Sequence, residues 1–189
     1  MPFTLKHSNK AEMIEILSTW EQSFQQKPKD SSKKEMRKKA LSIASQMQRT
    51  LAEQTHAHLW IAKESETNAP MAMMIVDDTA QREKTIRFLL SNQKVPESKG
   101  SGLFLVHQLT EMAARKRSKI KTTSENADKF WRKCPGFSPD PDNSGDYVCE
   151  PSSPVAGADR ASMSIFSSTK STKKNRQKIY KTCSLTVRS

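Results

Sequence analysis

The spacing of apolar side chains in the first third of the chain predicts one strand followed by two helices. Residues 2–8 alternate apolar and polar positions, which is the period of a half-buried strand. Residues 11–24 and 32–54 instead repeat their large apolar side chains at helical spacing, so that each segment has one apolar face. Ser8 or Asn9 can cap the first of these helices.

The middle of the chain predicts three neighbouring strands and a long helix. Residues 55–64, 70–78 and 85–92 are apolar runs of strand length, separated by short polar turns. Connections this short favour an antiparallel meander. A turn that contains glycine then leads into a helical pattern at residues 102–118.

The last third predicts shorter elements and a polar end. We expect a strand at residues 120–124, a helix at 125–134 that a Pro-Gly pair stops, and strands at 146–151 and 161–168. Residues 169–189 are polar and basic, and we expect a flexible tail there. The segment QKIYKTCSLTV within the tail is an alternative strand.

Together these elements predict an α/β fold of the α+β kind. Its mixed, mostly antiparallel central sheet would have about seven strands, flanked by four helices. Residues 1–168 would form this domain and residues 169–189 the basic tail. No apolar run is long enough for a membrane span, and the N-terminus has no signal-peptide pattern, so we expect a cytoplasmic protein without a membrane partner.

The composition adds a strong positive charge to this picture. The formal net charge is +12, and hydrophobic residues make up only 34% of the chain. Most of the excess lies in three clusters, at residues 27–39, 115–121 and 167–189. Clusters of one sign favour anionic partners and argue against small polycationic substrates, although each cluster taken singly can be a solvated helix face or tail.

The cysteines give no sign of a cross-linked or metal-binding protein. Cys134, Cys149 and Cys183 are odd in number and far apart in the sequence. Their spacing matches neither a disulfide framework nor a zinc site. We therefore expect a reducing compartment and no metal.

Candidate chemistry centres on the segment VPESKGSGLFLV, residues 95–106. It holds two of the 5 glycines in the chain, Gly100 and Gly102, at the expected strand-to-helix turn. Glycine lets backbone N–H groups approach a ligand closely, and the first amides of a helix are unpaired donors. The segment predicts either a phosphate cradle or a tight turn.

The order of elements and several local motifs resemble the GNAT (GCN5-related) family of acyl-CoA-dependent N-acyltransferases. FTLKHSNKAEMIEIL resembles the family's opening strand and first helix, and VPESKGSGLFLV its V-x-P-x-x-R-G-x-G-x-G turn. ENADKFWRKCPGF resembles its N-x-x-A-x-x-F-Y-x-x-x-G-F segment, and ASMSIF its closing strand. The resemblance covers residues 2–168.

The resemblance implies a cofactor site at the glycine turn. Backbone amides of Gly100, Ser101, Gly102 and Leu103 would hold the pyrophosphate of coenzyme A. Lys99 would stand where the family has Arg or Gln, as a flexible point charge in place of a planar fork.

The resemblance also implies two contacts further along the cofactor. Asn126 would lie beside the cofactor arm, and it can also serve as an N-cap. A backbone N–H in the stretch from Asn92 to Lys94 would hold the acetyl carbonyl.

Two positions depart from the family pattern. Phe104 stands where the family has Gly or Ala, and its ring would hinder the approach of pyrophosphate. The family's tyrosine, a general acid toward the leaving thiolate, is replaced by Trp131, or by Arg132 if the alignment runs back from Gly136. Tyr147 is then the candidate acid, and a packed strand tyrosine is the alternative.

Other candidates for the chemistry are weaker. Asp78 is a candidate base beside Asp77 and Glu97, although an aspartate pair here is typical of a hairpin turn. Cys134 suggests a covalent relay, but no histidine lies near it in the sequence to activate it, so a packing role is favoured.

These observations predict an N-acyltransferase, most simply an acetyltransferase that uses acetyl-CoA as cosubstrate. The acceptor would be an amine of a protein or of an anionic carrier such as aminoacyl-tRNA, because the clustered charge favours anions. The rival prediction is a catalytically degenerate GNAT-like module that binds nucleic acid or a protein partner through its basic clusters. A homodimer is left open.

Overall fold

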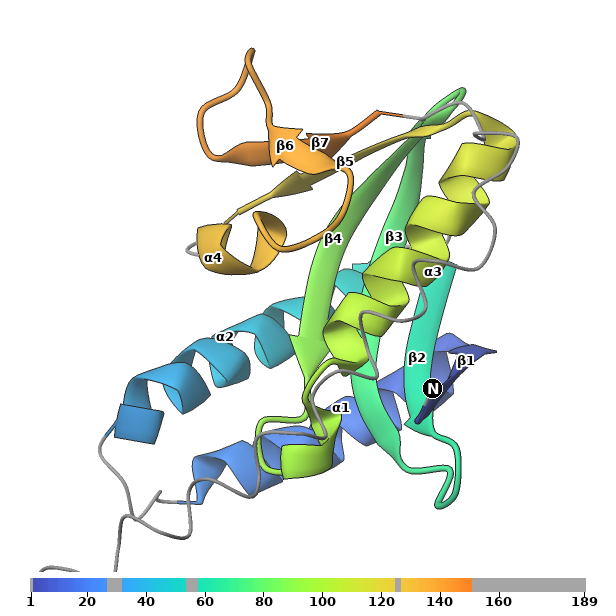
Figure 1. The fold of residues 1–189 in the computed structure, drawn as a ribbon. Coiled ribbons are helices and arrows are strands. Elements are labelled where there is room, and N and C mark those ends of the chain that lie inside the picture. Colours follow the sequence, from blue (N-terminus) through green and yellow to red (C-terminus); the bar gives the residue numbers. More distant parts are fainter. Residues whose placement is uncertain (1, 27–31, 54–57, 125–126, 151–189) are drawn as a thin grey trace, which may run out of the picture. The chain divides into compact units, whose positions relative to one another are not determined.

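The computed structural model describes residues 2–26, 32–53, 58–124 and 127–150, which form a seven-stranded sheet with helices on both faces (Figure 1). In chain order the elements are β1 (Phe3–His7), α1 (Lys10–Gln25), α2 (Ser32–Glu53), β2 (His58–Glu64), β3 (Pro70–Ala80), β4 (Glu83–Ser91), the 3-10 helix η1 (Pro96–Ser98), α3 (Ser101–Lys116), β5 (Lys119–Thr123), α4 (Asp128–Trp131), β6 (Phe137–Pro139) and β7 (Asp146–Cys149). No helix in these ranges is long and apolar enough to cross a membrane.

The strands lie in the order β1-β2-β3-β4-β5-β7-β6 across the sheet. Neighbouring strands are antiparallel, except that β4 and β5 are parallel. A parallel pair needs a long crossover connection, and η1 and α3 provide it. The glycine turn therefore lies within the crossover, between the end of β4 and the start of α3.

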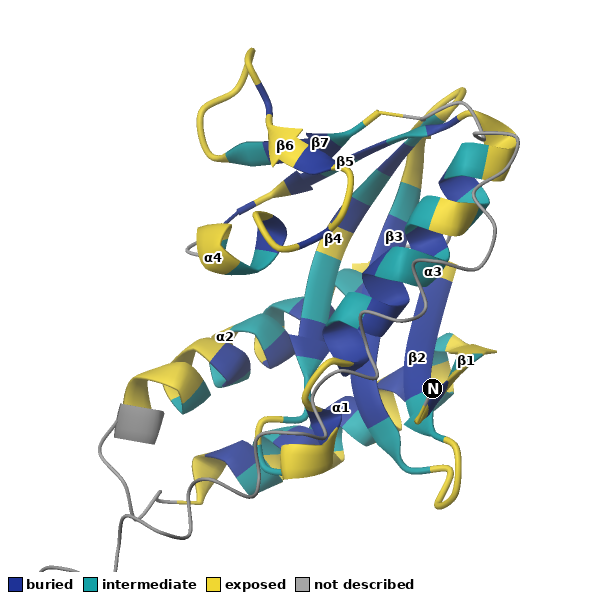
Figure 2. Ribbon diagram, in the orientation of Figure 1, coloured by how far each residue is buried: buried dark blue, intermediate teal, exposed yellow. Residues whose placement is uncertain are grey.

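The sheet is covered on both faces, which explains its uninterrupted apolar runs. On one face Met13 of α1 and Met47 of α2 pack in a cluster with Met73 of β3. On the other face Leu105 of α3 packs in a second cluster with Met74 of β3. Successive residues of a strand point to opposite faces, so a strand buried on both sides is apolar at every position. Figure 2 shows β3 buried along most of its length.

Strands β4 and β5 pair over only part of their length. Their last paired residues are Ile86 and Thr122, whereas β4 continues to Ser91. Arg87 is an extra residue of β4 relative to β3, because the register shifts at this point. A β-bulge bends its strand and increases the local twist. Beyond the bulge β4 and β5 diverge (Figure 1), so the second half of β4 keeps a backbone edge with which β5 does not pair.

The predicted fold class is confirmed, and the larger differences lie in the last third of the chain. The sequence prediction missed β6, because three residues that end in proline show no alternation. The helix expected at residues 125–134 is shorter, since α4 covers Asp128–Trp131. The strand expected at residues 161–168, the tail and the proposed domain boundary lie outside the described residues.

Candidate functional site

Within the part of the chain that the structure describes, the start of α3 presents several backbone donors without an acceptor. Gly100 is the N-cap residue and has a left-handed conformation, with φ of +93°. The first turn of the helix closes with the hydrogen bond from Phe104 N to Gly100 O, at 2.9 Å. Hence the amides of Ser101, Gly102 and Leu103 have no acceptor within the helix. A helix of 16 residues adds its dipole to these donors, so the turn is suited to an anion.

Gly102 allows α3 to pack closely against β4. A Cβ atom at this position would lie 3.1 Å from Ser91 Oγ and 3.6 Å from Leu89 Cδ2. The first distance is shorter than ordinary van der Waals contact. The two glycines thus have different roles, because Gly100 provides the left-handed turn and Gly102 the close approach to β4.

The side chain of Ser101 fixes this turn in place. Ser101 is fully buried, and its Oγ lies 2.6 Å from Ser98 O and 3.2 Å from Met71 O. The hydroxyl thereby ties the turn to η1 and to the start of β3. The sequence prediction gave Ser101 only a backbone role, and nothing in the sequence indicated this anchoring by the side chain.

The charged side chains next to the turn are exposed. Lys99 lies between η1 and α3, and its backbone N–H donates to Pro96 O at 3.2 Å. Its exposed side chain can reach an anion held at the turn as a flexible point charge. Glu97 is also exposed and makes no ion pair among the described residues.

The amides expected to hold an acyl carbonyl already have acceptors in this structure. Asn92 N donates to Met71 O at 2.9 Å, and Lys94 N donates to Asn92 Oδ1 at 3.2 Å. The N–H groups of successive strand residues point toward opposite neighbouring strands. Because the N–H of Asn92 points toward β3, the N–H groups of Leu89 and Ser91 point away from β3. Those two amides lie on the edge of β4 from which β5 has diverged, and the sequence prediction missed them.

The side chains of Leu89 and Ser91 are also the ones that meet Gly102. The unpaired amides at the start of α3 and the unpaired edge of β4 are therefore adjacent. A bulge is hard to see in a sequence, because one extra residue in a strand changes no residue type. The stretch from Asn92 to Lys94 was expected from the resemblance, and the edge of β4 adds Leu89 and Ser91 as candidate donors.

On the other side of the divergence, α4 and the residue after it contain the two side chains that stand in place of the family's tyrosine. Trp131 is 4% exposed and packs against Phe130 and Phe137, with ring centroids 4.9 Å and 5.3 Å away. Trp131 is thus a core residue. Arg132 is exposed, and its Nε donates a hydrogen bond to Tyr147 Oη at 3.2 Å. Asn126 lies outside the described residues.

Tyr147 lies in the row of the sheet where β4 and β5 separate. It pairs with Thr122, and Thr122 pairs with Ile86, the last paired residue of β4 on that side. Thr122 Oγ1 also donates to Ile86 O at 3.3 Å. Tyr147 is only 3% exposed, and its hydroxyl has Arg132 as a hydrogen-bond partner.

Phe104 and Cys134 have packing roles. The ring of Phe104 is 8% exposed and packs against Phe3 in the core, with the ring centroids 5.9 Å apart. Burial raises the pKa of the Cys134 thiol to about 12, and the nearby Cys149 adds to this effect. A thiol with this pKa is almost entirely protonated at neutral pH, which argues against a covalent relay through Cys134.

Asp78 lies far from the glycine turn. It belongs to the part of β3 that pairs with the start of β4, whereas the turn contacts Met71 at the opposite end of β3. Seven residues of extended strand separate them by roughly 23 Å. Asp78 contacts Lys84 and accepts a hydrogen bond from His58 at 2.9 Å, and these contacts, Lys84 first, lower its pKa. This geometry favours a structural ion pair over a catalytic base.

Among the described residues, no three His, Cys, Asp or Glu side chains gather in a way that could hold a metal ion. The free cysteines there are Cys134 and Cys149. The candidate site thus consists of the start of α3, the unpaired edge of β4, and the Arg132–Tyr147 contact.

This architecture is the GNAT fold: a mixed sheet in which the one parallel pair among the described strands diverges beside a glycine turn. Gcn5 from Tetrahymena matches it with a TM-score of 0.53 and 13% identity, over 81% of this chain and 98% of its own. YhbS from Escherichia coli, a GNAT-family N-acetyltransferase in complex with CoA, matches with a TM-score of 0.53 and 11% identity, over 80% of this chain and 83% of its own. No protein-family model and no curated protein sequence matches the chain. Identities this low establish the fold alone.

Proposed function

We propose that the chain is an acyl-CoA-dependent N-acyltransferase that uses acetyl-CoA as its donor. One observation carries the proposal: the free amides at the start of α3 adjoin the edge of β4 from which β5 has diverged. An anion-binding turn beside a strand edge with unpaired donors suits a long ligand that has a diphosphate at one point and amide groups further along. Coenzyme A has both features, and one solved relative of this fold holds it.

The residues around the turn fit the diphosphate of such a donor. The amides of Ser101, Gly102 and Leu103 would bind its oxygens, and Lys99 would add a positive charge at the surface. Phe104, which the sequence suggested as an obstacle, directs its ring into the core against Phe3. Asn126 remains a candidate for a contact with the pantetheine arm.

The reaction would take place where β4 and β5 separate. A neutral amine would attack the thioester carbon, and the backbone N–H of Leu89 or Ser91 would stabilise the negative charge that develops on the carbonyl oxygen. The carbon–sulfur bond would then break, and the thiolate would take a proton from Tyr147 Oη. The amine would lose its extra proton to water, because the Asp78 carboxylate is already engaged by Lys84 and His58.

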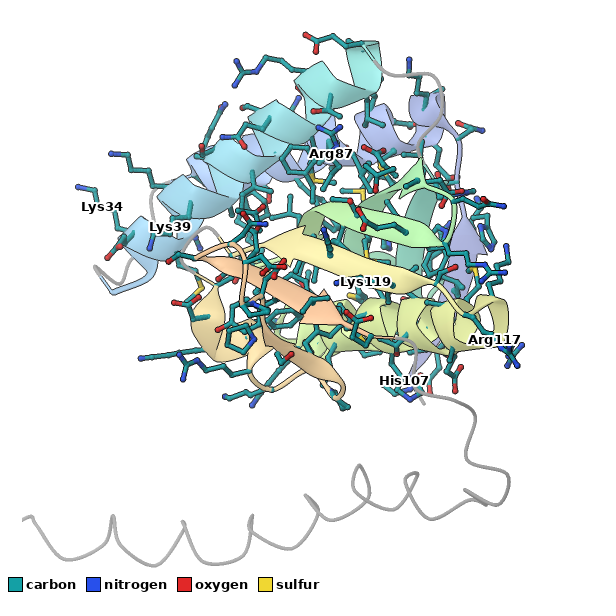
Figure 3. The ribbon with its side chains drawn as sticks, turned by 90° about the horizontal axis from the view of Figure 1, so that it is seen from above. Lys34, Lys39, Arg87, His107, Arg117 and Lys119 are labelled. Atoms are coloured by element: carbon teal, nitrogen blue, oxygen red, sulfur yellow. The ribbon has the colours of Figure 1, made fainter. Side chains whose placement is uncertain are left out.

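The acceptor amine would be carried by an acidic protein surface or an anionic carrier such as aminoacyl-tRNA. Lys34 and Lys39 project from α2 away from the sheet, whereas Arg117 ends α3 (Figure 3). Ion pairs neutralise part of this charge, since Lys39 pairs with Glu35 on α2, Lys119 with Glu150 and Lys121 with Glu83. The remaining positive charge favours an anionic partner.

A second candidate function is that of a non-catalytic module with the same fold. The observation in its favour is the arginine at the position where the resemblance implies the general acid, because a guanidinium cannot act as one near neutral pH. Such a module would bind its anionic partner without turning over acetyl-CoA.

The test is the transfer reaction itself. Acetyl-CoA would be incubated with the protein and either a peptide mixture that offers N-terminal and lysine amines or an aminoacyl-tRNA mixture, while thiol release and the mass of the acceptors are followed. We expect thiol release together with acceptors heavier by one acetyl group. Binding of acetyl-CoA without release of thiol in either mixture would support the non-catalytic module instead.

A further inference from the structure

Arg132 and Tyr147 are 15 residues apart in the chain and meet through one hydrogen bond, from Arg132 Nε to Tyr147 Oη at 3.2 Å. Arg132 directly follows α4 and is exposed, whereas Tyr147 lies in β7 and is 3% exposed. The sequence left either Trp131 or Arg132 at the position of the family's acid. Because Trp131 is packed among aromatic rings in the core, Arg132 is the residue whose side chain is available there.

We infer that Arg132 is a positioning residue for Tyr147, and that the two side chains together replace the single tyrosine expected from the motif. This inference rests on the proposed acyltransferase function. It assigns Tyr147 as the proton donor and Arg132 as the group that directs the phenol's proton and stabilises the charge left behind. Neither side chain would be sufficient alone, since arginine cannot give up its proton and the buried phenol needs an oriented partner.

The hydrogen bond determines where the phenol's proton points. A phenol oxygen has one proton and accepts hydrogen bonds near the plane of its ring. When Arg132 Nε occupies one acceptor position, the O–H bond of Tyr147 turns to the other side of the oxygen. The proton is then held away from the arginine and remains available to another acceptor, which in the proposed reaction is the leaving sulfur.

The proton balance of the step can be written out in full. As the carbon–sulfur bond breaks, sulfur keeps the electron pair and takes the proton from Tyr147, so that the products at this point are a thiol and a phenolate. The phenolate lies beside the Arg132 cation, and the hydrogen bond between the two side chains raises the pKa of that guanidinium. The amine releases one proton to water, and the phenolate of Tyr147 takes one proton from water. The next cycle therefore starts from the neutral phenol.

The position of Tyr147 in the sheet agrees with this assignment. Tyr147 pairs with Thr122, the last residue of β5 that is paired with β4, and its hydroxyl is contacted by Arg132, directly after α4. The acid would therefore lie beside the divergence of the two strands, while the glycine turn approaches β4 through Gly102 and Ser91.

The experiment is a double-mutant cycle on kcat with acetyl-CoA and the peptide or aminoacyl-tRNA mixture. The variants are Tyr147→Phe, Arg132→Gln, Arg132→Lys and the double variant Tyr147→Phe/Arg132→Gln, with Lys133→Gln as a control at the exposed neighbouring position. Thiol release gives kcat, calorimetry gives the Kd of acetyl-CoA, and thermal unfolding confirms that each variant folds.

We expect Tyr147→Phe to lower kcat by about 10²–10⁴-fold, the usual contribution of general acid catalysis. Arg132→Gln should lower it by about 10- to 100-fold, because a charge-assisted hydrogen bond is lost. Arg132→Lys should recover part of that loss, Lys133→Gln should have no effect, and the Kd of acetyl-CoA should change little. If Arg132 acts through Tyr147, the double variant should be no slower than Tyr147→Phe.

Three results would overturn the inference. These are an Arg132→Gln variant with unchanged kcat, a double variant in which the two losses multiply, and a Tyr147→Phe variant of normal turnover. In all three the wild-type protein still turns over acetyl-CoA, so the proposed function stands. A wild-type protein that releases no thiol would remove the proposed function and the inference together.

Discussion

Gly100 and Gly102 are constrained by different neighbours, so substitutions at the two positions should fail for different reasons. At Gly100 the constraint is conformational, because φ of +93° is unfavourable for most side chains, while the nearest atom to an added Cβ lies 4.0 Å away. At Gly102 the backbone is helical and the constraint is space, since an added Cβ would lie 3.1 Å from Ser91 Oγ.

A methyl group at Gly102 should therefore be tolerated only if Ser91 gives way. We expect Gly102→Ala to lower the free energy of unfolding by about 1 kcal/mol, the lower end of the cost of an overpacked contact. The double variant Gly102→Ala/Ser91→Ala, which removes the crowding oxygen, should recover most of this loss. Chemical denaturation of the two single variants and the double variant measures the coupling. If the changes in unfolding free energy of the two single variants simply add in the double variant, Ser91 Oγ is not the atom that crowds the added methyl group.

At the scale of elements, the start of α1 shows how local sequence and tertiary contacts combine. Asn9 caps the helix by accepting the N–H of Glu12 at 2.8 Å, as an N-cap residue three positions before a glutamate predicts. The Glu12 carboxylate in turn accepts hydrogen bonds from Lys6 at 2.7 Å, Ser8 at 2.9 Å and Lys63 at 3.3 Å. These contacts join β1, α1 and β2.

The contacts of Glu12 predict how stability depends on pH. Its pKa is lowered to about 2, mainly by the hydrogen bond from Lys6, with further contributions from Ser8 and Lys63. A lowered acid pKa gives stability that is complete above the unfolded value of 4.5 and is lost as the pH falls toward 2. We expect Glu12→Gln to cost about 1 kcal/mol at pH 7, the scale of a partly exposed ion pair, and to cost progressively less as the pH falls through 2.

The control for this measurement is Glu15→Gln in the same helix, because Glu15 is exposed and makes no ion pair among the described residues. Urea denaturation of both variants across this pH range provides the comparison. A Glu12→Gln penalty that persists unchanged down to pH 2 would assign the effect to packing, not to charge.

Most elements could be predicted from the sequence because their hydrophobic periods are long and regular. Helices α1, α2 and α3 each expose one face, and β2 to β4 are runs bounded by short turns, so their periodicity is visible. The glycine turn was visible for a different reason, since Gly100 and Gly102 stand one residue apart between two such elements. Strand β6, with three residues and a terminal proline, has no period to detect.

The features of the site that could not be predicted from the sequence depend on contacts between residues that are far apart in the chain. The hydrogen bond between Arg132 and Tyr147 and the anchoring of Ser101 on Met71 leave no trace in local spacing. The bulge at Arg87, which decides which amides of β4 are free, can be recognised only from the pairing of β3 with β4.

At the scale of the whole molecule, the net charge of +12 should govern association with polyanions more than it governs folding. Residues 169–189, which lie outside the described residues, carry seven basic side chains, few large apolar ones and no acidic one. The composition of this segment therefore predicts a role in long-range electrostatics.

Deleting residues 169–189 should leave the melting temperature nearly unchanged and weaken binding to an RNA oligonucleotide, most strongly at low salt. The matched control is a full-length variant in which the basic residues of this segment are replaced by glutamine. It should lose RNA affinity to the same extent if charge is the cause. A truncated chain that unfolds or precipitates would show that the segment QKIYKTCSLTV contributes to the fold.

The central claim is that the start of α3 binds the diphosphate of acetyl-CoA, and a pair of variants at Gly100 tests it most directly. Asn and Asp have nearly the same shape and both tolerate the left-handed conformation, so Gly100→Asn and Gly100→Asp differ chiefly by one negative charge. Titration calorimetry with acetyl-CoA should show binding by the wild-type protein and by Gly100→Asn. Binding by Gly100→Asp should be at least about tenfold weaker than by Gly100→Asn, because its carboxylate would face the diphosphate. A wild-type protein that binds no acetyl-CoA, or equal affinities of the two variants, would contradict the account.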